Sequence, residues 1–183
     1  MSTTYTAYLI LHLSYFILYT TLMNHLWSPW RMEYLDGNNK VDGCVFCVAQ
    51  TMQDSAENLI VHRGEHAYVI LNLYPYTSGH VLVVPFEHVP NLEELDPSTR
   101  AEMMELTSQS MTVLRSIYKP QGFNMGANLG SAAGAGVPEH VHLHIVPRWN
   151  GDTNFMSTLG QTRVLPEALA DTYERIKNGF QKI

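Results

Sequence analysis

Short apolar runs separated by turn residues recur along the middle of the chain and predict β-strands. The runs at residues 59–62 and 67–71 flank a turn-like sequence at residues 63–65, and together they predict a β-hairpin. A third run at residues 80–85 is apolar after its first position, as is typical of a strand that is buried on both faces. These three strands form the first part of an expected sheet.

One long helix is predicted after these strands. Asp96 and Pro97 are typical of a helix N-terminus, where Asp acts as the cap and Pro occupies the first helical position. Side chains for one face then follow at helical spacing: Met104, Thr107, Met111, Leu114 and Tyr118. We expect this helix to cover the sheet and to end at residues 119–122, where Pro and Gly stand close together.

The remaining pattern predicts two more strands and a second helix. Residues 123–128 and 139–146 read as a fourth and a fifth strand, with a loop of small residues at 130–136 between them. A final amphipathic helix is expected from Pro166 to about Phe180. A chain of 183 residues is long enough for one compact domain with a sizeable core.

The first residues differ from the rest of the chain. Residues 5–23 carry no charge and are mostly apolar or aromatic, and this segment is nearly long enough to cross a bilayer. No Lys or Arg precedes them, so they lack the basic start of a secretory signal. Three interpretations stay open: a spurious or disordered extension, a membrane-associated helix, and a packed helix. We assign residues 1–23 to an extension and residues 24–183 to the domain.

Charge and cysteine content narrow the function classes. The net charge of −6 argues against a nucleic-acid-binding protein, because such proteins need a cluster of Lys and Arg. The two cysteines, Cys44 and Cys47, are spaced as C-x-x-C, which suits a redox pair or half of a zinc site. Either interpretation suits a reducing compartment, and we expect a cytoplasmic protein, with membrane association as the less favoured alternative.

Three histidines stand at alternate positions of the fifth predicted strand. Since side chains alternate in an extended strand, His140, His142 and His144 would share one face and the apolar residues between them the other. Surface histidines on an edge strand and a metal-binding face are the alternatives. Imidazole can also attack phosphorus, because it is largely neutral at pH 7. It must be oriented by a carbonyl or a second imidazole that fixes its tautomer.

The loop of small residues before these histidines could approach a phosphate closely. Gly134 and Gly136 lack side chains, so backbone N–H groups near them could reach phosphate oxygens. A plain turn is the alternative for such a loop. Its position beside three histidines favours the phosphate-binding interpretation.

The stretch His140-Val-His-Leu-His-Ile-Val146 resembles the signature of the histidine-triad (HIT) superfamily, in which histidines alternate with apolar residues. The resemblance covers roughly residues 27–155, and residues 26–31 and 149–155 look like the bacterial branch similar to diadenosine tetraphosphate phosphorylases. It implies an α+β fold with a five-stranded antiparallel sheet, a long covering helix and, as the pattern also predicts, a C-terminal helix. It also implies a homodimer paired through the long helix and the sheet edge.

The resemblance also implies roles for single residues. His142 would form a nucleotidyl-histidine intermediate, His144 would lie near the leaving oxygen, and His140 would belong to the supporting shell. Asn72 matches the position that holds the ribose hydroxyls, and Asn128 the position that contacts phosphate. For both asparagines a turn or a strand end is the alternative.

A structural zinc ion is a further implication. Relatives with C-x-x-C near the start bind zinc through two cysteines, a histidine after the third strand and the first triad histidine, which here are Cys44, Cys47, His88 and His140. Four such ligands would close the coordination shell and leave no position for water. No organic cofactor is expected. His80 matches a family Gly-His pair and is interpreted as a hydrogen-bonded core residue.

The implied function is that of a hydrolase or nucleotidyltransferase acting on a nucleoside 5′-phosphoryl compound, with a purine nucleotide or a dinucleoside polyphosphate such as diadenosine tetraphosphate as substrate. A nucleoside phosphoramidase and a non-catalytic nucleotide-binding module are the alternatives. Many family members carry Gln-Ser or Gln-Thr directly before the triad, whereas this chain has residues 136–139 as Gly-Val-Pro-Glu. The leaving group and the acceptor, water or phosphate, therefore stay open.

Overall fold

The computed structural model describes residues 43–153 and 167–183. The apolar segment 5–23, the segment 26–31 and Pro166 lie outside the described residues. Within the described part of the chain, no helix combines the length and apolar character that a membrane span requires.

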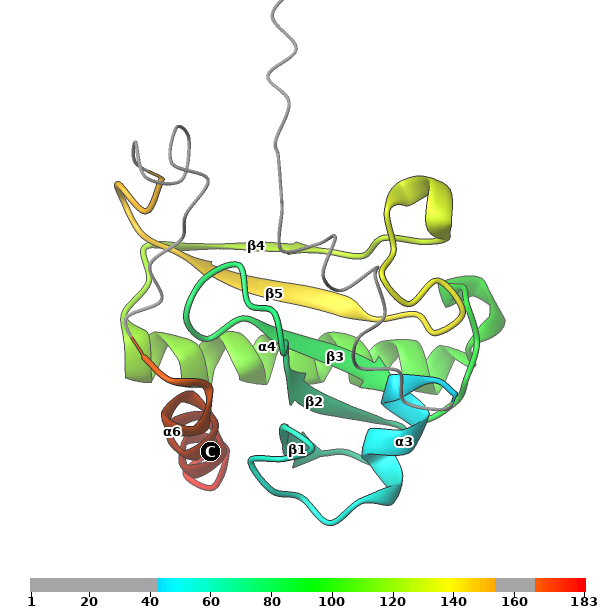
Figure 1. Ribbon diagram of the computed structural model, residues 1–183, viewed down its shortest axis with the longest axis horizontal. Coiled ribbons are helices and arrows are strands. Elements are labelled where there is room, and N and C mark those ends of the chain that lie inside the picture. The colour runs from blue at the N-terminus through cyan, green and yellow to red at the C-terminus, as the bar shows by residue number, and fades with distance from the viewer. Residues whose placement is uncertain (1–42, 154–166) are drawn as a thin grey trace, which may run out of the picture.

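The centre of the molecule is a five-stranded antiparallel sheet (Figure 1). Its strands lie in the order β1-β2-β3-β5-β4, and every neighbouring pair is antiparallel. The bounds of the strands are β1 Ile60–Arg63, β2 Ala67–Leu71, β3 Val81–Pro85, β4 Gly122–Gly126 and β5 Leu143–Arg148. The predicted α+β fold with a five-stranded antiparallel sheet is therefore confirmed.

Within residues 43–153 and 167–183, three α-helices and two short 3-10 turns accompany the sheet. Their bounds are α3 Val45–Thr51, η1 Leu92–Glu94, α4 Pro97–Tyr118, η2 Ser131–Ala133 and α6 Leu169–Phe180. The long helix α4 runs across one face of the sheet, with α3 near the β1–β2 end and α6 beside β1 (Figure 1). Every residue of β2 and β3 is buried, as the continuous apolar run of the third strand predicts.

The face that α4 turns to the sheet differs from the predicted one. Thr107 and Leu114 are buried as expected, but Met104 is 52% exposed. Ser110, which the prediction did not include, is buried as well. The hydroxyls of Thr107 and Ser110 each donate a hydrogen bond to the helix carbonyl four residues earlier, at 2.8 Å and 2.6 Å. Small side chains that satisfy their own polar groups can thus occupy the close contact between helix and sheet.

The fifth strand begins later than predicted. β5 starts at Leu143, so His140 and His142 precede the strand. The ladder with β3 ends at the pair Val83↔Leu143. Before that point the backbone N–H of Val141 donates to the carbonyl of Val89 at 2.8 Å, outside the sheet. The three histidines are therefore not one strand face: two stand on the segment that enters the strand and one within it.

The C-terminal helix packs against α4 and β1. Gly179 permits the contact with α4, because a Cβ atom there would lie 2.5 Å from Val113 Cγ1. At the end of α6 the Phe180 ring stacks on His62 of β1, with ring centroids 4.7 Å apart and an interplanar angle of 11°. Burial lowers the pKa of His62, and the nearby Glu102 carboxylate opposes this shift only in part.

This stacked histidine makes stability depend on pH. Its folded pKa lies below the unfolded value of about 6.5, so the contact stabilises the fold above that pH and loses its effect as the pH falls. His62→Phe keeps a ring against Phe180 but cannot be protonated. We expect the variant to lose less unfolding free energy than the wild type between about pH 7 and about pH 5. Denaturant unfolding across this range measures the difference, and equal losses would contradict the assignment.

Candidate functional site

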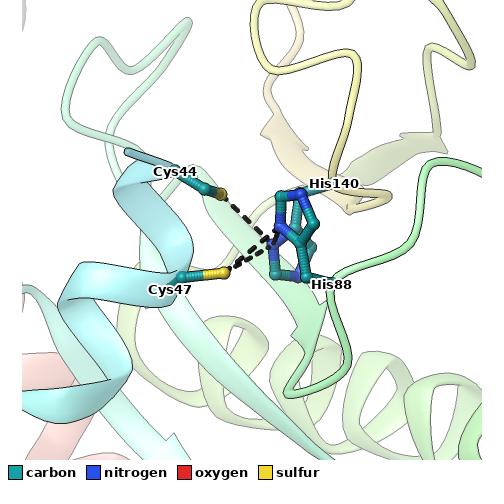
Figure 2. Close-up of side chains that lie close together, drawn as sticks. All are labelled: Cys44, Cys47, His88 and His140. Atoms are coloured by element: carbon teal, nitrogen blue, oxygen red, sulfur yellow. Dashed lines mark hydrogen bonds between the residues drawn. The ribbon is translucent and has the colours of Figure 1, made fainter. Parts of the chain in front are cut away.

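Four side chains from distant parts of the sequence meet beside the N-terminal end of α3 (Figure 2). Cys44 is the N-cap of α3 and Cys47 lies in its first turn, while His88 follows β3 and His140 precedes β5. Their sulfur and nitrogen atoms all lie within 4.8 Å of one another. The predicted ligand set is thus brought together as a group that could hold a metal ion.

The distances within this Cys44-Cys47-His88-His140 group fit a tetrahedral zinc site. His140 Nδ1 lies 3.3 Å from Cys44 Sγ, 3.6 Å from Cys47 Sγ and 3.2 Å from His88 Nδ1. His88 Nδ1 lies 3.2 Å from Cys47 Sγ. Ordinary zinc bond lengths place tetrahedral S and N ligands about 3.6 Å apart, and two N ligands about 3.3 Å apart.

The imidazole of His140 is oriented for this role by a backbone carbonyl. Its Nε2 lies 3.0 Å from the carbonyl oxygen of Pro85, at the end of β3. A carbonyl can only accept, so Nε2 carries the proton and Nδ1 presents its lone pair to the other three ligands. Burial lowers the pKa of His140, which favours the neutral form that a metal ligand requires.

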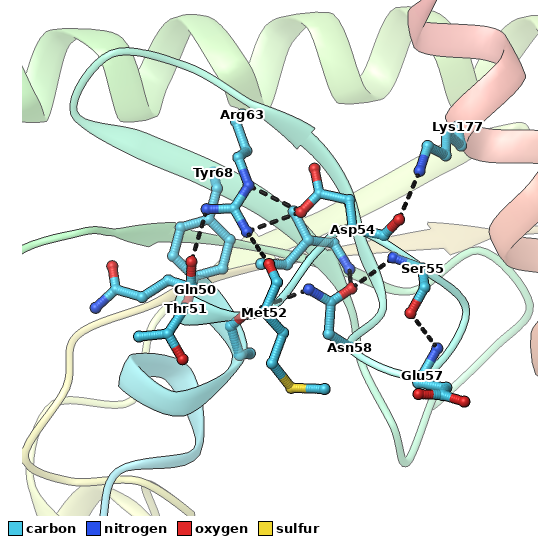
Figure 3. A network of polar contacts seen from close by, with 12 residues as sticks. Gln50, Thr51, Met52, Asp54, Ser55, Glu57, Asn58, Arg63, Tyr68 and Lys177 are labelled. Atoms are coloured by element: carbon cyan, nitrogen blue, oxygen red, sulfur yellow. Dashed lines mark hydrogen bonds and ion pairs between the residues drawn. The ribbon is translucent and has the colours of Figure 1, made fainter.

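Two polar side chains fix the C-terminal end of α3 and so hold the cysteines in place (Figure 3). Arg63 of β1 donates to the carbonyls of Gln50 and Met52 at 3.0 Å and 3.2 Å, and pairs with Asp54 at 2.7 Å. The buried Asn58 donates from Nδ2 to the carbonyl of Ala49 at 3.2 Å. Helix carbonyls that lack partners within α3 are thus satisfied by side chains.

His142 is buried and held by one backbone hydrogen bond. Its Nδ1 lies 2.8 Å from the carbonyl oxygen of His140, so Nδ1 donates and Nε2 carries the lone pair. Burial lowers the pKa of His142 and favours the neutral ring, and the bond to the carbonyl opposes this in part. The structure thus provides the carbonyl that the sequence argument requires to orient an attacking imidazole.

A second chain of hydrogen bonds leads to His144. The backbone N–H of Tyr76 and the side-chain amide of Asn72 lie 3.1 Å and 3.2 Å from His80 Nδ1. His80 Nε2 lies 3.0 Å from His144 Nδ1, and the rings of His142 and His144 have centroids 4.9 Å apart. Because Nδ1 of His80 accepts, its Nε2 donates to His144. The neutral ring of His144 then carries its proton on Nε2.

Asn72 has a contact that the sequence does not predict. Its Oδ1 accepts a hydrogen bond from the N–H of Tyr74 at 3.1 Å, while its Nδ2 faces His80. The residue therefore both shapes the turn after β2 and fixes the tautomer of His80. Its contact with a ribose stays a prediction.

The small-residue loop uses several of its own N–H groups. Ala133 and Ala135 both donate to the carbonyl of Gly130 at 3.2 Å, and Gly134 donates to the carbonyl of Ser131 at 2.9 Å. Gly134 has a φ of +83°, a conformation that glycine adopts without strain. A phosphate cradle made of these three N–H groups would have to break the turn. Asn128, half-buried after β4, and Gly136 flank the loop, and their phosphate contacts also stay predictions.

Sequence reasoning missed the part that two aromatic residues play in this site. Phe46 lies between the two cysteines, and its ring centroid is 5.0 Å from that of His142. Tyr76 lies nearly parallel to His144, with centroids 6.2 Å apart and an interplanar angle of 8°. Their proximity to the site could have been anticipated from their positions next to the C-x-x-C pair and the Gly-His pair, but their contacts depend on the fold.

Comparison with known proteins identifies the family. The family model for the HIT domain matches residues 53–151. The chain belongs to the HIT domain family. A protein of Mycobacterium tuberculosis named AP-4-A phosphorylase is 40% identical over 157 residues, which is 82% of this chain and 80% of that protein. The asymmetrical bis(5′-nucleosyl)-tetraphosphatase of Schizosaccharomyces pombe is 34% identical over 93 residues, 51% of this chain and 50% of its own length.

Solved structures of HIT proteins share the fold. The Zn-bound histidine triad family protein of Mycobacterium smegmatis has a TM-score of 0.62 and is 29% identical, over 76% of this chain and 94% of that protein. A histidine triad nucleotide-binding protein of Sulfolobus tokodaii has a TM-score of 0.60 and is 27% identical, over 76% of this chain and 93% of the other. This chain and both structures therefore have the same HIT fold.

The anchoring of α3 can be tested at Asn58. Its side chain is 5% exposed and accepts from the N–H groups of Ser55 and Ile60 at 2.9 Å and 3.4 Å, besides its bond to Ala49. Asn58→Ala removes all three hydrogen bonds, although the Ala49 carbonyl keeps the N–H of Met52 as a donor at 3.2 Å, so we expect a loss of about 1–3 kcal/mol in unfolding free energy. Chemical denaturation measures it. Asn178→Ala, at an exposed position of α6, is the control and should change stability by less than about 0.5 kcal/mol. Equal effects would contradict the anchoring role.

Proposed function

We propose that the protein is a nucleotide hydrolase or nucleotidyltransferase that acts on a nucleoside 5′-phosphoryl compound through His142. The observation that carries the proposal is the hydrogen bond from His142 Nδ1 to the His140 carbonyl, which leaves Nε2 as a nucleophile. The names of the relatives from M. tuberculosis and S. pombe support a dinucleoside polyphosphate, such as diadenosine tetraphosphate, as the substrate.

In the first step the lone pair on His142 Nε2 attacks the phosphorus next to the nucleoside. A P–N bond forms and the P–O bond to the leaving group breaks, and that oxygen takes the electron pair of the broken bond. His144 keeps its proton on Nε2 and donates a hydrogen bond from it to this oxygen, which stabilises the negative charge that the leaving group carries away. His80 and Asn72 act as positioning residues, because they determine which nitrogen of His144 holds the proton.

In the second step the acceptor attacks the same phosphorus. Water or inorganic phosphate forms a new P–O bond, the P–N bond breaks, and His142 Nε2 regains its lone pair. The Nε2–H of His144 again donates a hydrogen bond to a phosphoryl oxygen, and the proton that a water acceptor releases passes to the solvent. The cycle is a double displacement, in which His142 attacks the phosphorus in the first step and the acceptor attacks it in the second.

Four further residues are proposed to bind the nucleotide. Asn72 would hold the ribose hydroxyls and Asn128 a phosphate oxygen, in keeping with the family resemblance. Gly134 and Gly136 would let the loop backbone approach the phosphates. The base would be a purine, as in diadenosine tetraphosphate.

We further propose that the Cys44-Cys47-His88-His140 group holds a structural zinc ion. Two thiolates and two imidazoles are a donor set that zinc prefers, and the interatomic distances of the group match a closed tetrahedron. The ion would tie α3 to the segment that carries His142 and would take no part in the reaction. The Zn-bound structure from M. smegmatis supports this assignment.

A cytoplasmic homodimer is the proposed working form. β4 is an edge strand of the sheet, and Met125 on it is 49% exposed. An edge strand with an exposed apolar side chain is suited to pairing with a second copy of the chain. The dimer would then be paired through the sheet edge and α4, as the family resemblance implies.

The first prediction concerns the reaction and its acceptor. Purified protein incubated with diadenosine tetraphosphate should yield AMP and ATP if water is the acceptor, and ADP and ATP if inorganic phosphate is. Chromatography of the products, with and without added phosphate, distinguishes the two. Tight nucleotide binding without product from any phosphoanhydride or phosphoramidate would instead support a binding module, and product from a phosphoramidate alone would support a phosphoramidase.

The second prediction concerns the nucleophile. His142→Ala removes the attacking nitrogen, so kcat should fall by about three orders of magnitude or more. His66→Ala changes a partly exposed histidine outside the site and is the matched control, with kcat expected near the wild-type value. Turnover by His142→Ala at the control rate would refute the covalent mechanism.

The third prediction concerns the metal. Elemental analysis of the purified protein should find one zinc per chain, and His88→Ala should bind zinc more weakly because it removes one of four ligands. A strong chelator should lower the thermal midpoint of the wild type, since zinc binding contributes free energy to folding. Zinc-free protein whose melting is insensitive to the chelator would rule the site out.

A further inference from the structure

Phe46 lies where the metal-binding group and the proposed nucleophile meet. Its ring centroid is 5.4 Å from that of His140, with the planes at 76°, and 5.0 Å from that of His142, with the planes at 54°. The side chain is only 6% exposed, so it offers little surface to a ligand. The ring is part of the hydrophobic core and also contacts the two histidines, and the residue stands between Cys44 and Cys47 in the sequence.

The backbone of Phe46 is fixed from two directions. The residue belongs to α3, whose first turn carries the two cysteines. The hydroxyl of Tyr68, a fully buried residue of β2, donates to the carbonyl of Phe46 at 2.9 Å. The Cα atom of Phe46 therefore cannot move away from the histidines unless α3 moves with it, and burial of the side chain restricts the rotation of the ring.

A single hydrogen bond does not fix the orientation of an imidazole ring. The bond from His142 Nδ1 to the His140 carbonyl fixes one atom of the ring. Rotation of the ring about its χ2 bond has a broad energy profile, so the ring could still tilt and carry Nε2 away from its direction of attack. A neighbouring ring packed against it removes this freedom, and Phe46 occupies that place.

We propose that Phe46 is a positioning residue, which transmits the rigidity of the C-x-x-C segment to His142 and keeps Nε2 directed at the substrate. The proposal rests on the proposed function in so far as His142 is the nucleophile. His142 is then constrained twice from the same group of residues: through the backbone carbonyl of His140 and through the ring of Phe46. Both routes start at residues next to, or within, the Cys44-Cys47-His88-His140 group.

The test replaces the ring without emptying the space. Phe46→Leu keeps an apolar side chain in the core but removes the flat surface against His142. In zinc-loaded protein we expect kcat with diadenosine tetraphosphate to fall about tenfold or more, since small errors in placing a reacting group are costly, while KM changes less. Phe123→Leu, which removes a ring from β4 opposite Pro147, three residues beyond His144 on β5, is the control and should keep the wild-type kcat.

A second readout does not depend on turnover. The ¹⁵N chemical shifts of the His142 imidazole should report one tautomer with the proton on Nδ1 in the wild type and in Phe123→Leu. In Phe46→Leu they should report a mixture of tautomers, with zinc content still one per chain. If Phe46→Leu keeps both the wild-type tautomer and the wild-type kcat, the proposal is overturned. It is also overturned if Phe46→Leu loses activity only because it loses zinc. If the wild type turns over no phosphoanhydride, the proposed function fails, while the tautomer comparison still decides the role of Phe46.

Discussion

The backbone carbonyl of His140 is the constraint on which the site depends. It accepts the hydrogen bond that fixes the tautomer of His142, while the side chain of the same residue faces Cys44, Cys47 and His88. One residue thus joins the metal-binding group to the triad. This arrangement is possible because His140 and His142 precede the strand: within the sheet, the carbonyl and the side chains would be committed to the ladder and its faces.

Contacts from two sides hold His140 and the cysteines that it faces in place. On one side, β3 ends at Pro85, whose carbonyl orients His140, and Val89 in the chain beyond pairs with Val141. On the other side, Arg63 and Asn58 satisfy the carbonyls of α3 and fix the helix that carries the cysteines. The Cys44-Cys47-His88-His140 group lies between these two sides and draws residues from both of them.

The sequence predicted most of the fold because its signals are local. Asp96-Pro97, the run at 80–85 and the turn at 63–65 each determine a structure within a few residues, and the helix, the buried strand and the hairpin were all predicted correctly. The burial of Ser110 and the exposure of Met104 could not be predicted, because burial of a serine depends on a hydroxyl that bonds within the helix at a tertiary contact. The early end of the β3–β5 ladder also depends on a distant partner, the carbonyl of Val89. The family resemblance supplied the four residues of the metal-binding group, whereas the places of Phe46 and of Asn72 beside His80 required the structure.

The hydrogen bonds around His80, His142 and His144 assign each of these three rings a neutral tautomer. His80 Nδ1 faces two donors, the N–H of Tyr76 and the amide of Asn72, so a proton on that nitrogen would point at other protons. His80 must therefore be neutral and donate from Nε2 to His144. His142 donates from Nδ1 to a carbonyl, and burial disfavours a second proton on its ring. The two rings that face the substrate in the proposed reaction thus differ: His142 presents a lone pair and His144 presents a proton. In the proposed reaction, the nucleophile and the hydrogen-bond donor to the leaving group would differ only in which ring nitrogen carries the proton, although the two side chains are chemically identical.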